Sequence, residues 1–380
     1  MPPCTGTPRP ERARRRRRIA LVAVALSGVL ASNVAAGGPA PEGRGAKPIR
    51  IAPGSVEGLR ILLSNDDGVQ PGQSSQGLYE LRKALCAGGA DVAVVGPWFD
   101  RSGASASITY GSASTRFTLT EPAIDGAYTD DCLGAPSAGA VWGACLTSAT
   151  APPPCGPEST TLSPADAVTL GATAAVQQLL GWTDGPDLII AGVNRGGNDG
   201  LNVNVSGTVG AATIGSSLGV PSIAISASSS GNWGANAQAA ATWSAGFVGL
   251  LAANDLLPAD YVLNVNYPRT DRAPITDAVW TNVAQLAPTA TSYTRDGDLS
   301  FMSVFGACPP GPRCGSAEPG SDSAVYSSGK ISISAVSVNR SAGAPAGSAA
   351  VQAVVQAGFA SPVQAPRPPG NPPVVVPPHP

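Results

Sequence analysis

Short apolar runs alternate with segments of helical spacing along most of this chain, and this alternation limits the fold more than any other feature. The apolar run at 59–64 is followed by leucines at helical spacing in 77–87 and by a second apolar run at 91–96, which predicts a βαβ unit. The later members are the expected helices 165–180, 207–218 and 237–253 and the expected strands 187–191, 222–226 and 261–266. This pattern predicts a doubly wound α/β fold with a mostly parallel sheet.

The remaining segments set the expected domain organisation. Beyond residue 271 the pattern changes to strand-like alternation, as in Ile331-Ser332-Ile333, which predicts an antiparallel extension at one edge. Residues 58–345 are expected to form one Rossmann-like α/β/α sandwich with this extension. Residues 122–162 hold three cysteines and no sustained period, so we expect a disulfide-stapled surface insertion. The C-terminal segment 346–380 ends in a proline-rich tail that contains His379, the only histidine.

The first 36 residues have the features of a secretory signal peptide. Five arginines at 14–18 precede an apolar run at 19–30, and Val34-Ala35-Ala36 offers small residues for cleavage. A membrane anchor is the alternative, but the apolar run is shorter than the roughly 20 residues that span a bilayer. Residues 37–57 are expected to be a linker. We therefore expect a secreted or periplasmic protein, exported by the Sec or the twin-arginine route, without a stable membrane span after processing.

Charge and cysteine content bound the partners of the processed chain. Removal of residues 1–36 takes away seven arginines and one glutamate, which leaves 16 basic and 24 acidic residues and a net charge near −8. This balance argues against a duplex nucleic acid as partner. Six cysteines remain, and an even number outside the cytoplasm favours disulfides, with the pairing open. A zinc site is the alternative, but no C-x-x-C pair and no nearby histidine supports it.

Catalytic chemistry without histidine points to carboxylates and a metal. Serine and cysteine triads need an imidazole base, and His379 lies in the tail. Asp66 and Asp67 stand side by side at the carboxyl end of the first expected strand, where open α/β sheets bind their ligands. A hard divalent cation such as Mg²⁺ or Mn²⁺ would relieve the repulsion between these carboxylates. For Asn-Asp-Asp-Gly alone, a simple turn is the alternative.

Further polar segments are expected at the same edge of the sheet. Arg101-Ser102-Gly103 and residues 193–198 follow later expected strands and carry oxygen ligands. Ser206-Gly207-Thr208 opens an expected helix, whose free N–H groups and positive dipole end favour an oxyanion. An ordinary N-cap is the alternative for that tripeptide. Together these segments predict a metal beside a phosphate site.

These residues resemble the SurE family of 5'/3'-nucleotidases in five blocks that follow the family's order. The blocks are residues 60–68, 101–105 with 107–109, 186–196, 205–212 and 263–268. The resemblance implies a metal-dependent phosphomonoester hydrolase that cleaves nucleoside monophosphates through a metal-activated water and forms homodimers or higher homo-oligomers. It implies Asp66, Asp67, Ser102 and Asn194 as ligands of Mg²⁺ or Mn²⁺, with Asp66, Asp67 and Asn194 as the catalytic residues. The implied phosphate-binding residues are Asn198, Ser206, Gly207 and Thr208.

Departures from the family's pattern keep other functions open. Residues 70–75 replace the usual Ala-Pro-Gly-Ile beside the metal, and Ser163-Pro164-Ala165-Asp166-Ala167 replaces Thr-Pro-x-Asp-Cys. The alternatives are a secreted acid phosphatase acting broadly on small phosphomonoesters, a receiver-type signalling domain, and a catalytically silent secreted metal-binding scaffold. A receiver domain fits poorly, because it would need a lysine near the paired acids and the three lysines lie elsewhere.

Overall fold

The computed structural model describes residues 54–111, 115–275, 277–308, 311, 313–314, 318–339 and 348–357. All of them belong to the unit that starts at Pro48. The expected signal peptide 1–36, most of the expected linker and the proline-rich tail with His379 lie outside the described residues.

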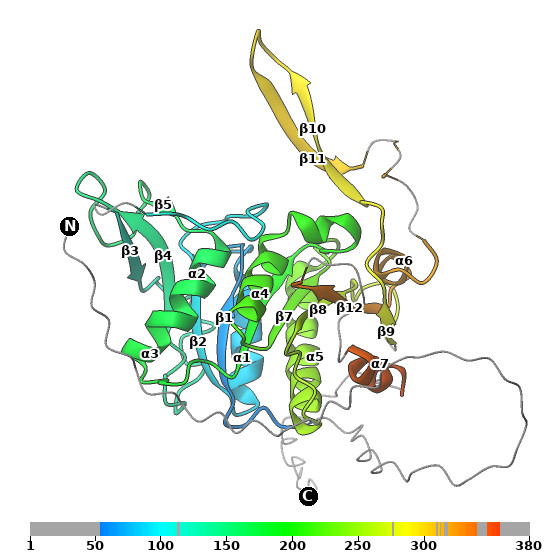
Figure 1. Cartoon of the computed structure of the whole chain (residues 1–380), viewed down its shortest axis with the longest axis horizontal. Coiled ribbons are helices and arrows are strands. Elements are labelled where there is room, and N and C mark those ends of the chain that lie inside the picture. Colours follow the sequence, from blue (N-terminus) through cyan, green and yellow to red (C-terminus); the bar gives the residue numbers. More distant parts are fainter. Residues whose placement is uncertain are drawn as a thin grey trace, which may run out of the picture. The chain divides into compact units, whose positions relative to one another are not determined.

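A ten-stranded sheet forms the centre of this unit (Figure 1). Nine strands follow the order β3-β4-β2-β1-β6-β7-β8-β12-β9, and the short β5 pairs with β4. The strands are β1 (Arg60–Ser64), β2 (Asp91–Pro97), β3 (Arg116–Thr120), β4 (Val141–Thr147), β5 (Thr160–Thr161), β6 (Leu188–Arg195), β7 (Ser222–Ala227), β8 (Tyr261–Tyr267), β9 (Ala278–Thr281) and β12 (Ile331–Ser337). All pairings from β4 across to β8 are parallel. Numbered along the chain, these six strands lie in the doubly wound order 3-2-1-4-5-6, which confirms the predicted fold class.

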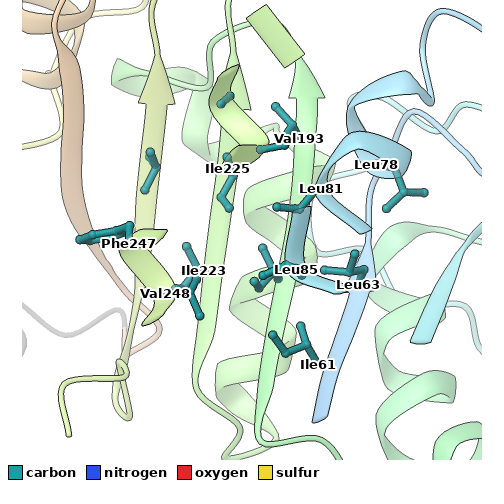
Figure 2. Close-up of a cluster of buried hydrophobic side chains, with 14 of the residues drawn as sticks. Ile61, Leu63, Leu78, Leu81, Leu85, Val193, Ile223, Ile225, Phe247 and Val248 are labelled. Carbon is teal, nitrogen blue, oxygen red and sulfur yellow. The ribbon is translucent and has the colours of Figure 1, made fainter. Parts of the chain in front are cut away.

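Helices cover both faces of the sheet. The helical segments are α1 (Gln76–Ala87), α2 (Pro164–Leu170), the π-helical turn η1 (Gly171–Ala175), α3 (Val176–Leu179), the 3-10 helix η2 (Gly200–Asn204), α4 (Gly207–Ser217), α5 (Trp233–Ala253), α6 (Asp322–Ser327) and α7 (Ser348–Gln356). Alternate strand residues point to opposite faces, so each face has its own core. Ile61 and Leu63 of β1 belong to one core with leucines of α1 and Phe247 of α5 (Figure 2), whereas Leu62 belongs to the core on the side of α2 and α4.

The expected helix 165–180 is divided in the structure into α2, η1 and α3. Its start follows from the sequence, because Ser163 and Asp166 form a capping box. The Ser163 hydroxyl accepts a hydrogen bond from the Asp166 backbone N–H at 2.9 Å, and the Asp166 carboxylate accepts one from the Ser163 N–H at 3.4 Å. The motif that departs from the family's pattern therefore still begins a helix.

The region 122–162 differs from the expected surface insertion. It contributes β4, a largely buried strand that pairs in parallel with β2. The small residues Gly143 and Ala144 interrupt its apolar pattern, so the sequence did not predict this strand. The structure pairs Cys132 with Cys86 of α1, and Cys145 with Cys155. The insertion is thus bonded both to a helix of the core and within itself.

The C-terminal part adds the predicted antiparallel extension. β12 runs antiparallel to β8, and β9 lies outside it. Between β9 and β12, the strands β10 (Thr289–Arg295) and β11 (Phe301–Ala307) form a separate two-stranded ribbon that extends away from the sheet (Figure 1). Cys308, directly after β11, pairs with Cys314. Among the described helices, none has the length and hydrophobicity required to cross a bilayer.

Candidate active site

The acidic loop lies where the winding of the sheet changes direction. β1 and β6 are adjacent parallel strands, and the segments that follow them pack on opposite faces: α1 on one, α4 on the other. In open α/β sheets, ligands bind at such a switch point, outside the carboxyl ends of the strands. Asp66 and Asp67 follow β1, and Asn194 lies at the end of β6. The structure therefore brings these three residues to one edge of the sheet.

Both carboxylates are nearly buried and are held by hydrogen bonds. Asp66 is 3% exposed and accepts a hydrogen bond from the Thr208 hydroxyl at 2.6 Å. Asp67 is 8% exposed, and its Oδ2 accepts hydrogen bonds from Asn65 Nδ2 at 2.8 Å and from the Arg195 backbone N–H at 3.0 Å. These donors fix the orientation of both side chains. No cation neutralises either carboxylate among the described residues.

Burial changes the proton affinity of this pair. Burial raises the pKa of Asp66, while hydrogen bonds from Thr208 act in the opposite direction. Burial and the neighbouring charge of Asp66 raise the pKa of Asp67 to about 8. Asp100 adds further negative charge near both groups. Raised carboxylate pKa values of this kind are typical of functional sites.

Ser102 lies on a loop that is tied to the acidic loop. The Arg101 N–H donates to the Asp66 carbonyl at 2.7 Å, and the Ser102 N–H donates to Asp100 Oδ1 at 2.7 Å. Farther along, the Asp166 carboxylate accepts hydrogen bonds from both the backbone N–H and the hydroxyl of Thr109. Asp166, the N3 residue of the capping box of α2, thus also fixes the far end of the Ser102 loop.

The four expected phosphate-binding residues are placed differently from one another. Asn198 and Ser206 line the cleft described below. The Ser206 hydroxyl also caps α4 by accepting from the Val209 N–H at 3.0 Å. Gly207 touches Asp66 so closely that an added Cβ would lie 2.7 Å from the Asp66 Cβ. Thr208 is fully buried, and its hydroxyl donates a hydrogen bond to the Asp66 carboxylate.

A cleft of about 800 Å³ opens beside Asp66. This volume is within the usual range for small-molecule sites. Its polar end is formed by Asp66, Ser102, Asn194, Asn198 and Ser206. Its other end is formed by η2 and by the ribbon. Arg195 is the one cationic side chain among the described residues that line it.

The donor set at the polar end fits a hard divalent cation. Asp66, Ser102 and Asn194 face the same cleft, with Asp67 adjacent. Because the Asn194 amide nitrogen donates to the Gly196 carbonyl at 2.7 Å, its oxygen is left for another partner. Carboxylate, hydroxyl and amide oxygens are the ligands of Mg²⁺ and Mn²⁺. No group of three or more His, Cys, Asp or Glu suited to a metal occurs in the described part of the chain.

Several residues of the site were not predicted from the sequence. Asn65 and Arg195 orient Asp67 through hydrogen bonds. Both stand next to predicted ligands in the blocks that resemble the family, and this position in the sequence could have indicated a role at the site. Thr289, Tyr293 and Phe305 line the cleft from the ribbon, about 100 residues farther along the chain. Nothing in their local sequence indicates that the ribbon reaches the site.

Comparisons with known proteins identify the family of this chain. The family model described as "Survival protein SurE" matches residues 61–289. The 5'-nucleotidase SurE of Nitrosococcus oceani is 33% identical over 281 residues, covering 74% of this chain and 92% of that protein. The 5'/3'-nucleotidase SurE of Escherichia coli O157:H7 is 32% identical over 286 residues, covering 75% and 92%. A crystal structure of the SurE protein from Aquifex aeolicus aligns with a TM-score of 0.48 at 24% identity, covering 74% and 94%. By its sequence, this chain belongs to the SurE family.

Proposed function

We propose that this protein is a metal-dependent phosphomonoester hydrolase acting on nucleoside monophosphates, a 5'/3'-nucleotidase. The observation that carries the proposal is the pair of nearly buried carboxylates, Asp66 and Asp67, at the switch point of the sheet and without a cationic partner among the described residues. The names of the SurE relatives support nucleotidase activity. Divalent-metal chemistry can use such a pair without histidine, because the cation activates the water.

In this proposal Asp66, Asp67, Ser102 and Asn194 hold Mg²⁺ or Mn²⁺. When bound, the cation supplies positive charge to the phosphoryl oxygens and activates water as the nucleophile. Thr208 and Asn65 keep the carboxylates oriented. Asn198, Ser206 and Gly207 border the position of the phosphate, where the start of α4 favours negative charge. Arg195, exposed at the cleft, adds a positive charge for the phosphate.

Phosphate release from AMP with Mg²⁺ or Mn²⁺ tests the proposal. Asp67→Asn keeps the size of the side chain but removes its charge, and it should lower kcat/KM by about 100-fold, since losses around metal ligands cost 10–100-fold or more. Asp130→Asn, the same change on an exposed residue of the insertion, is the matched control and should retain full activity. Equal activity of Asp67→Asn and wild type, or no activity of wild type with any divalent cation, would contradict the proposal.

Export and assembly stay predictions. The three disulfides formed by described cysteines support a location outside the cytoplasm, where such bonds persist. Fractionation should find the protein outside the cytoplasm, and a protein found only in the cytoplasm would contradict export. N-terminal sequencing of the exported protein should give a start after Ala36, and a protein retaining residue 1 would contradict cleavage there. The expected homodimer or larger homo-oligomer is tested by sedimentation, where a monomer would exclude it.

A further inference from the structure

The two ends of the cleft differ in chemistry. One end carries the carboxylates, hydroxyls and amides of the proposed metal and phosphate sites. The opposite end is lined by Leu201, Val205, Ala287, Tyr293 and Phe305, side chains that are apolar or aromatic. Orthophosphate alone would use only the first end. A nucleotide also presents a flat base with two π-faces, which such a wall can bind.

We propose that Tyr293 and Phe305 form a stacking platform for the base of the substrate and make the enzyme prefer nucleotides over simple phosphate esters. This inference rests on the proposed function and assigns base binding to the ribbon side of the same cleft.

The strand register places both rings on one face of the ribbon. Thr289, Thr291 and Tyr293 alternate along β10 and share a face. Phe305 of β11 is directly opposite Thr291, so its side chain lies on this face too, diagonal to Tyr293. Both rings are largely exposed, at 69% and 66%, although they line the cleft. Exposed aromatic faces at a cleft wall are available to a ligand.

The root of the ribbon is fixed relative to the metal site. The Asn202 amide donates to the Thr289 hydroxyl at 2.6 Å, and the Leu201 N–H donates to the Leu286 carbonyl at 3.2 Å. The buried Asp322 carboxylate accepts hydrogen bonds from the N–H groups of both Gly200 and Ala284. The loop that carries Asn194 and Asn198 is therefore bonded to the segment that starts the ribbon. This arrangement sets the direction from phosphate to base before substrate binds.

The platform is expected to select the base by the area of its stacking face rather than by its hydrogen-bonding groups. On the ribbon itself, the lining side chains that can form hydrogen bonds carry hydroxyls, on Thr289, Thr291 and Tyr293. At the same end, Asn202 of η2 carries an amide, whose nitrogen donates to the Thr289 hydroxyl. A hydroxyl donates or accepts equally well, and no amide, carboxylate or cation of the described ribbon lines the cleft. We therefore expect purine nucleotides to be favoured over pyrimidine nucleotides only by several-fold, following stacking strength.

The test compares AMP, UMP and glycerol phosphate as substrates with saturating Mn²⁺. Phe305→Ala and Tyr293→Ala should each raise KM for AMP about tenfold, the scale of one lost stacking contact, and leave kcat and the hydrolysis of glycerol phosphate unchanged. Phe301→Ala removes an aromatic ring from the same ribbon face outside the cleft lining, and Val304→Ala changes the opposite face. Both control variants should behave as wild type.

Several outcomes would overturn the platform: unchanged KM for AMP in both cleft variants, equal losses for AMP and glycerol phosphate, or the same effect in Phe301→Ala. Calorimetric binding of AMP and of inorganic phosphate to the Mn²⁺-loaded protein separates this inference from the proposed function. If wild type binds AMP without turnover and Phe305→Ala weakens AMP but not phosphate, the platform stands and the catalytic proposal fails. If AMP and phosphate bind wild type equally well, the platform fails.

Discussion

Asp66 accepts its hydrogen bond from a neutral side chain, so its negative charge stays available to a cation. The Thr208 hydroxyl fixes one carboxylate oxygen without neutralising the group, whereas a lysine or arginine at that position would compete with a cation. Asp67 likewise accepts hydrogen bonds from neutral donors, the Asn65 amide and the Arg195 backbone N–H. Gly207 leaves the space that this approach needs. The site therefore retains two negative charges in a nearly buried position.

Removal of the Thr208 hydroxyl should weaken the metal site without unfolding the helix. Thr208→Val keeps the shape of the side chain, but Asp66 loses its hydroxyl donor and can rotate. Changes to groups that orient a ligand typically cost 10–100-fold in metal affinity, so we expect a loss of about tenfold in Mn²⁺ affinity by calorimetry. Thr213→Val is the matched control, because that hydroxyl donates to the Val209 carbonyl on the same helix. A Thr208→Val protein with wild-type affinity would show that the hydrogen bond has no such role.

The raised pKa values give the metal-free protein a defined pH dependence. Asp66 and Asp67 bind protons more tightly when folded than when unfolded, because burial raises both pKa values. The ionisation of Asp67 therefore costs stability between the ordinary value of 3.8 and about 8, and that of Asp66 acts in the same direction. In EDTA, the Tm of wild type should therefore fall from about pH 5 to about pH 8 more steeply than the Tm of Asp67→Asn. Added Mg²⁺ should raise Tm most near pH 8, where protons no longer compete. Parallel curves for wild type and Asp67→Asn would contradict this.

At the residue scale, the sequence predicted which loops carry the site but not the direction of every side chain. Asp66, Asp67 and Asn194 follow strands directly, so strand topology alone brings them together. Thr208 follows the N-cap of α4, where its side chain could point either to the phosphate or to a neighbouring residue. Only tertiary packing against Asp66 decides between the two. The site roles themselves stay proposals.

Helix α1 connects the cysteine-rich insertion to the acidic loop. Arg82 is almost fully buried and donates to the carbonyls of Gly139, Tyr128 and Asp131. The Tyr79 and Tyr128 rings stack with centroids 5.4 Å apart, and the Tyr79 hydroxyl donates to the Val69 carbonyl at 2.6 Å. Val69 lies two residues after Asp67. The insertion therefore supports the helix that follows the metal loop.

The disulfide between α1 and the insertion should contribute more to stability than the one after the ribbon. Cys86 and Cys132 are 46 residues apart, whereas Cys308 and Cys314 are six residues apart. Loop-closure entropy predicts that Cys86→Ser/Cys132→Ser lowers the free energy of unfolding by about 4 kcal/mol, and Cys308→Ser/Cys314→Ser by about 2 kcal/mol. Urea unfolding of the oxidised proteins measures both. Equal losses, or a larger loss for the second pair, would reject this ranking.

Among the elements, those with strong apolar periodicity were predicted best. β1, β2, β6, β7 and β8 match the expected strands to within a few residues because a parallel strand buried on both faces needs an apolar run. β4 was missed, and the ribbon falls in the region predicted to be strand-like but was not predicted to stand apart from the sheet. β4 is buried but rich in small residues, and β10 and β11 are exposed on both faces, so neither shows the burial pattern that its neighbours show.

At the scale of the whole molecule, the site depends on pairing between distant parts of the chain. Arg60 at the start of β1 and Asp187 just before β6 are joined by hydrogen bonds across 127 residues. The ligand loops follow these two strands, and Ser102 comes from the segment after β2. The sequence predicted this convergence from topology, whereas the contribution of the ribbon required the three-dimensional structure.

The adjacency of β1 and β6 also decides when a cation can be acquired. Pairing of strands so far apart in the chain is slow, because a long loop must close before any contact compensates its entropy. An unfolded chain holds only the two neighbouring aspartates together and therefore offers no complete set of ligands. A chain translocated unfolded would load its metal from the medium where it folds, whereas a chain translocated folded would carry out a cation selected inside the cell.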